Sequence, residues 1–138
     1  MAGKEFEELG PLIAAIGEEA TRLVGGNPDG LYIYIEVFEG VIGASIFRDE
    51  GNSVRYFDYD QDFIAAVEDA WYAQEPGKRW SVMEYEVTGK RFDASFAYPE
   101  EVDVESFDVD RREIALQKRY GDKPRIYPPI SKDAIRWK

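Results

Sequence analysis

Carboxylates are the side chains most able to do chemistry in this chain, and many of them gather in one stretch. Between residues 93 and 110 of the 138-residue sequence there are seven carboxylates and no Lys or Arg. They are Asp93, Glu100, Glu101, Asp103, Glu105, Asp108 and Asp110. Two carboxylates that flank a substrate at a fixed separation can perform acid–base chemistry, but no spacing here selects a pair. Because the chain also lacks His and Cys, the usual catalytic and metal-binding groups near neutral pH are missing, and we expect binding instead of catalysis.

A second acidic stretch superficially resembles a calcium-binding loop. Asp58, Asp60 and Asp62 alternate, and Asp69 stands at the twelfth position. The sixth position is Phe63, where the sharp turn of such a loop needs Gly. The stretch is better interpreted as the start of a helix that Asp60 or Asp62 caps. We therefore expect no metal site and no cofactor.

Nucleophilic chemistry has little support in the sequence. Ser45, Ser81 and Ser95 have no His to activate them, and no nucleophile elbow surrounds any of them. A Ser–Lys arrangement stays open but has no motif behind it. Gly25-Gly26 belongs to neither of the glycine-rich phosphate-binding motifs. We expect a protein that is not an enzyme.

The net charge of the chain disfavours some classes of binding partner. A net charge of −11 repels nucleic acid and anionic lipid, which need Lys and Arg for neutralisation. Residues 1–110 carry 25 acidic and 8 basic side chains, whereas residues 111–138 carry 3 acidic and 9 basic ones. The basic tail is expected to fold back on the acidic part, and a weak anion-binding arm is the less favoured alternative.

The first half of the chain predicts two helices around a strand meander. Apolar residues at helical spacing predict a helix that ends at Gly25-Gly26. Pro11 is expected in its first turn, with residues 4–10 as a separate or kinked lead-in. Strands are predicted at 31–38, 41–47 and 53–59, because β-branched and aromatic runs alternate with Gly-containing turns. A second helix follows, with Phe63, Val67, Ala70 and Trp71 on its apolar face.

The second half predicts a hairpin, a helix and a tail. Residues 80–87 and 91–98 alternate around Thr88-Gly89-Lys90. Val82, Glu84 and Glu86 then share one face, which we expect to meet solvent or a partner. Asp110 is predicted to cap a helix over 111–120, and 124–129 is predicted to be extended.

This order, α-β-β-β-α-β-β-α, predicts an α+β fold in which helices pack on one face of an antiparallel sheet of about five strands. We expect a single domain over residues 1–138, in which 122–138 is a Pro-rich basic tail. No signal peptide and no long apolar run stand out. A soluble cytoplasmic protein is the expectation.

The late hairpin has a distinct pattern of aromatic and glycine residues, and a basic helix follows it. The residues of this pattern are Trp80, Met83, Tyr85, Gly89, Lys90, Phe92, Asp93, Phe96 and Tyr98, followed by Arg112-Glu113-Ile114 and Lys118-Arg119-Tyr120-Gly121. The pattern resembles that of the YezG-like immunity proteins, over about residues 4–121. The element order is similar as well. The tail from Lys123 to Lys138 departs from the family pattern, so nothing is carried over to it.

The resemblance implies a cytoplasmic immunity protein, or antitoxin, that binds and neutralises a cognate toxin, with a basic nuclease as the expected class. The partner-binding carboxylates would then be Glu100, Glu101, Asp103, Glu105, Asp108 and Asp110, and nearby aromatic side chains would add contact area. We expect no direct contact with nucleic acid or membrane. The alternative is a structural or regulatory domain that self-associates, and the sequence leaves the oligomeric state open.

Overall fold

The protein has an α+β fold, which confirms the predicted class. A computed structural model describes residues 2–38, 40–102 and 108–127, together with the side chains of 9–38, 40–102 and 111–127. The helices and strands are α1 (Ala2–Leu23), β1 (Leu31–Phe38), β2 (Val41–Asp49), β3 (Val54–Phe57), α2 (Gln61–Tyr72), β4 (Val82–Thr88), β5 (Arg91–Ala97), η1 (Pro99–Glu101), α3 (Asp108–Tyr120) and β6 (Arg125–Ile126). The predicted order of helices and strands is therefore present, with a short 3-10 helix and one strand in addition.

The strands form one six-stranded sheet in the order β5-β4-β1-β2-β3-β6. Neighbouring strands are antiparallel except β3 and β6, which are parallel. β6 lies in the segment that the sequence predicted to be extended. It becomes a strand because Arg125 and Ile126 pair with Val54 and Arg55 of β3, a long-range contact that no local pattern reveals. Residues 128 and 129 of that segment lie outside the described residues.

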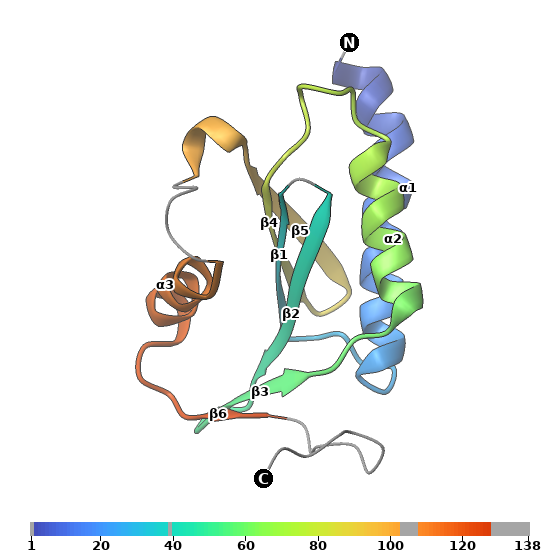
Figure 1. The fold of residues 1–138 in the computed structure, drawn as a ribbon. Coiled ribbons are helices and arrows are strands. Elements are labelled where there is room, and N and C mark those ends of the chain that lie inside the picture. Colours follow the sequence, from blue (N-terminus) through green and yellow to red (C-terminus); the bar gives the residue numbers. More distant parts are fainter. Residues whose placement is uncertain (1, 39, 103–107, 128–138) are drawn as a thin grey trace, which may run out of the picture.

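Helices α1 and α2 lie side by side on one face of the sheet (Figure 1). Odd-numbered residues of β1 point to this face, because side chains alternate along a strand. The buried residues of this layer include Ile16, Ala20, Leu31, Ile33, Ile35, Val37, Ile46, Phe63, Val67, Met83 and Tyr85. Each large apolar side chain buried here contributes about 1.5–3 kcal/mol to stability.

Helix α3 packs on the opposite face (Figure 1), so the expectation that all helices share one face is wrong. Leu116 of α3 is buried against Tyr32 and Tyr34 of β1 and Val82 of β4. The physical reason lies in β1, whose residues are buried on both faces, as is typical of a strand covered by helices on each side. The polar face of the β4–β5 hairpin is therefore covered in part by α3 and does not meet only solvent.

Pro11 lies inside α1 and not in its first turn. The prediction of a separate lead-in over residues 4–10 is therefore wrong. A proline inside a helix removes one hydrogen bond and costs about 3 kcal/mol. The turns after Pro11 bury Ile16 and Ala20 completely, and this burial offsets the cost of the proline.

The two later helices begin at acidic residues. Asp60 caps α2, since its side chain accepts a hydrogen bond from Phe63 N at 3.1 Å. This confirms the first of the two predicted caps. Asp110 does not cap α3, because α3 begins two residues earlier, at Asp108. Asp110 stands instead in the first turn of α3, where a negative charge still interacts favourably with the positive end of the helix dipole.

Candidate binding surface

The structure describes the side chains of two of the six predicted partner-binding carboxylates. Glu100 and Glu101 belong to η1, directly after β5, and both are exposed. The Glu101 carboxylate accepts a hydrogen bond from Tyr98 N at 3.1 Å, which fixes it at the start of η1. Asp103 and Glu105 lie outside the described residues. Asp108 and Asp110 stand in the first turn of α3, but their side chains lie outside the described part as well.

Three further carboxylates lie on the neighbouring hairpin. Asp93 of β5 stands opposite Glu86 of β4, and Ser95 stands opposite Glu84. Together with Ala94, these side chains line a hollow of about 160 Å³. The alternation along β4 gave the signal for Glu84 and Glu86, because residues two apart on a strand share a face. We call Glu84, Glu86, Asp93, Glu100 and Glu101 the acidic edge.

The arginines of α3 are turned inward, onto the sheet. Arg111 pairs with Glu36, which is 5% exposed, with 2.8 Å between Arg111 Nη2 and Glu36 Oε1. Arg119 pairs with Glu86 and lies over the ring of Tyr32, with 4.4 Å from Cζ to the ring centroid. These contacts show that basic residues of α3, within the basic part 111–138, pair with acidic residues of the sheet, as the charge asymmetry predicted; residues 128–138 lie outside the described residues.

Two tyrosines complete this layer between α3 and the sheet. The Tyr32 hydroxyl donates to Glu84 Oε1 at 2.5 Å, and the Tyr34 hydroxyl donates to Glu36 Oε2 at 2.6 Å. Burial raises the pKa of both phenols above the ordinary tyrosine value, and the hydrogen bonds to the carboxylates raise it further. Both phenols therefore act as neutral donors that hold the carboxylates in place.

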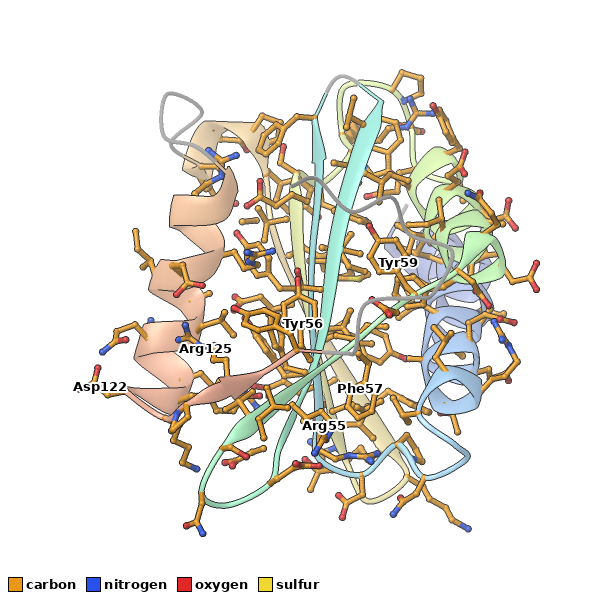
Figure 2. All side chains as sticks on the ribbon, turned by 60° about the horizontal axis from the view of Figure 1, so that its bottom comes forward. Arg55, Tyr56, Phe57, Tyr59, Asp122 and Arg125 are labelled. Atoms are coloured by element: carbon orange, nitrogen blue, oxygen red, sulfur yellow. The ribbon has the colours of Figure 1, made fainter. Side chains whose placement is uncertain are left out.

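A second polar cluster joins α3 to β2 and β3. The Tyr56 hydroxyl donates to Ser45 Oγ at 2.6 Å, and Arg112 Nη1 lies 3.0 Å from the Tyr56 hydroxyl and 3.2 Å from Ser45 Oγ. Figure 2 shows Tyr56 on the side of α3 and Phe57 on the side of α1 and α2. Ser45 is buried and receives hydrogen bonds from two donors, so its oxygen is not arranged as a nucleophile, which needs an adjacent base.

A wider groove separates α3 from η1 and the hairpin. It has a volume of about 610 Å³, and its lining includes Glu84, Glu101, Ile114, Lys118 and Arg119. Ile114 is 68% exposed, so an apolar side chain stands at the rim. Acidic side chains on the η1 and sheet sides thus face basic ones on the α3 side.

Comparison with protein-family models and with curated proteins finds no match for this chain. The resemblance to YezG-like immunity proteins therefore stays a prediction. Within the described residues, no three His, Cys, Asp or Glu side chains come together as a metal site would require. No helix in that part of the chain combines the length and the apolar character needed to cross a membrane. The fold and its polar layer define an α+β domain with one acidic edge.

Proposed function

We propose that the protein is an immunity protein, or antitoxin, that has no enzymatic activity and neutralises a cognate basic toxin by binding it through the acidic edge. One observation carries the proposal. Glu100 and Glu101 stand exposed next to a hairpin that presents Glu84, Glu86 and Asp93.

The basic side chains between the start of α3 and the end of β6 support this assignment because many of them are already paired. Arg111 is held by Glu36, Lys123 by Asp49 and Arg125 by Glu113. Within the acidic edge Glu86 is also paired, with Arg119, and Asp93 with Arg91. The exposed Glu100 and Glu101 are therefore the carboxylates that this proposal assigns to the partner. A complementary potential accelerates the association of two proteins and suppresses wrong partners.

A nuclease is the expected kind of toxin. An enzyme that binds a nucleic acid presents cationic side chains to the phosphates. Carboxylates along an edge can occupy the same cationic surface and keep the substrate away. In this role Glu100 and Glu101 supply charge, while the exposed aromatic ring of Phe92 and the rim residue Ile114 supply contact area.

The proposal is tested by affinity capture from the native host at low and moderate salt, with the captured proteins identified by mass. The captured protein is then expressed in a second host with and without this chain. We expect a single basic protein that arrests growth alone and is harmless when co-expressed. Capture of no toxic protein, or of one that this chain does not neutralise, contradicts the proposal.

Charge reversal locates the surface. The double variant E100K/E101K is expected to slow association with the toxin about tenfold and to weaken its salt dependence. The matched control is E68K/D69K, which makes the same change of charge at two exposed residues of α2. If both variants slow association equally, only net charge matters and the acidic edge is not the binding surface.

A further inference from the structure

Strand β5 is an open edge of the sheet. It pairs with β4 on one side, and no other strand of the described chain lies on its second side. Residues 91–95 are exposed, and β5 contains no Pro that would block pairing. Its seven residues span about 23 Å, whereas β6 at the other edge has two residues. The unpaired N–H and C=O groups of such an edge can bind a further strand.

The two faces beside this edge differ in chemistry. On the side of α3, Asp93 and Ser95 adjoin the hollow that Glu84 and Glu86 line. Asp93 pairs with the exposed Arg91 and Glu86 pairs with Arg119, so a basic segment would compete with these two arginines for the carboxylates. On the side of α1, Phe92 is 37% exposed and its ring lies 5.6 Å from that of Tyr85. A strand added to β5 would therefore meet carboxylates on one face and an aromatic ring on the other.

We propose that β5 binds an extended segment of the toxin in which basic and apolar side chains alternate. The segment adds a seventh strand to the sheet. Its Lys or Arg side chains lie over Asp93 and the acidic hollow, and its apolar side chains lie beside Phe92 and Phe96. This inference rests on the proposed function for the source of the segment, and it names the binding mode.

Charge selects a basic segment over a second copy of this chain. If the β5 strands of two copies paired in antiparallel fashion, the two sheets would become one continuous sheet. This sheet would carry two hollows, each lined by Glu84, Glu86 and Asp93 of one copy. Each copy also carries a net charge of −11. Two chains that each carry this net charge repel one another, whereas a basic segment is attracted to the chain.

The probe is a seven-residue peptide of alternating Lys and Val, blocked at both ends, with a peptide of the same composition in two blocks as control. We expect the alternating peptide to bind at least tenfold more tightly than the block peptide and more weakly as salt rises. Amides of residues 91–97 should gain protection from hydrogen exchange when it binds. Equal binding of the two peptides, absence of binding, or no added protection in β5 overturns the proposal.

Backbone methylation tests the hydrogen bonds themselves. One isomer of the peptide is N-methylated on every Val and another on every Lys, because alternate residues of a strand direct their N–H groups to opposite edges. One isomer should lose at least tenfold in affinity while the other binds as before. If both isomers bind like the parent peptide, no strand is added at β5.

Side-chain variants separate this inference from the proposed function. D93K should weaken the alternating peptide at least tenfold, and D69K on the distant helix α2 should not. If E100K/E101K loses toxin binding while D93K binds the toxin as the wild type does, strand addition is overturned and the antitoxin assignment stands. If the peptide adds a strand to β5 but the chain neutralises no toxin, the antitoxin assignment is overturned and strand addition stands. Dimers that form through β5 would also overturn the proposal.

Discussion

Arg111 of α3 and Glu36 of β1 form an ion pair inside the interface between helix and sheet. Their side chains are 13% and 6% exposed, and Arg111 Nε lies 3.2 Å from both Glu36 oxygens. The Tyr34 hydroxyl donates to the same carboxylate. Arg111 Cζ also lies 4.9 Å from the centroid of the Phe38 ring. This arrangement explains how a polar face of the sheet can bury a helix, since each charge has a partner.

Removing one member of this pair should be costly. R111M leaves the buried Glu36 carboxylate without its guanidinium, and we expect a loss of about 3–5 kcal/mol in the free energy of unfolding. The double variant E36L/R111M should lose less than R111M alone, because no buried charge remains. Urea unfolding followed by circular dichroism measures all of these values. The single variant E36L completes the set. If the losses in unfolding free energy of R111M and E36L add up to the loss in the double variant, the two side chains do not stabilise each other.

Gly17 of α1 marks a close approach of the helix to the sheet. A Cβ added there would lie 2.4 Å from Tyr85 Oη and 2.7 Å from Phe92 Cε1. Although Ala favours a helix over Gly by about 1 kcal/mol, we expect G17A to lower the free energy of unfolding by about 1–3 kcal/mol. The loss should shrink in the Y85F background, where the nearest atom is gone. Thermal or urea unfolding of the four proteins measures it, and a stabilised G17A would disprove the contact.

Buried tyrosines should make the fold sensitive to alkali. Burial raises the pKa of Tyr32, Tyr34, Tyr85 and Tyr120 above the unfolded value of about 10. Between these two pKa values the unfolded chain binds fewer protons, so each tyrosine lowers stability by up to about 1.4 kcal/mol per pH unit as the pH rises. Below about pH 10, the neutral phenols contribute their full stabilisation to the folded state.

Denaturant unfolding between pH 7 and pH 11 measures this slope. Y85F should flatten it by about one quarter, since one of the four phenols with a raised pKa is removed, although it also loses the hydrogen bond to the Ile13 carbonyl oxygen at 3.1 Å. Tyr72, which is 56% exposed, provides the surface control Y72F. An alkaline slope that is the same in Y85F and in the wild-type protein would show that Tyr85 ionises equally in both states.

Asp60 links α2 to α1 by two different interactions. It caps α2 and also pairs with Arg22 Nη2 at 2.8 Å. D60N keeps an acceptor for the cap and loses the charge, whereas D60A loses both, so stability should fall from wild type through D60N to D60A. Melting temperatures at pH 7 test this order. A D60N protein as unstable as D60A would assign the whole effect to the ion pair.

The charge of Asp60 also predicts a dependence on acid. The hydrogen bond from Arg22 and the one from Phe63 N lower the pKa of the carboxyl. A lowered folded pKa stabilises the protein above the unfolded value of about 3.9, and the stabilisation is lost as the pH falls through the folded pKa. The difference in melting temperature between wild type and D60N should therefore be constant above about pH 5 and vanish in strong acid. A difference that persists there would contradict the role of the charge.

The sequence by itself determined the elements whose signals are local. Helical spacing of apolar residues gave the buried faces of α1 and α2, and the two-residue turn at Gly89 gave the β4–β5 hairpin. The carboxylates of the acidic edge were also evident, because alternation on a strand and clustering after it need no tertiary contact. The β-branched and aromatic run of β1 indicated a strand, but it did not show that helices cover both of its faces.

Only the tertiary structure decided where α3 lies and what its arginines do. Arg111 and Glu36 are 75 residues apart in the chain, and no local spacing shows that they pair. The same holds for β6, which becomes a strand only where β3 offers it an edge. Such contacts depend on the surfaces that remain after the local elements have packed. For the same reason the open edge at β5 became visible only once the order of the strands was known.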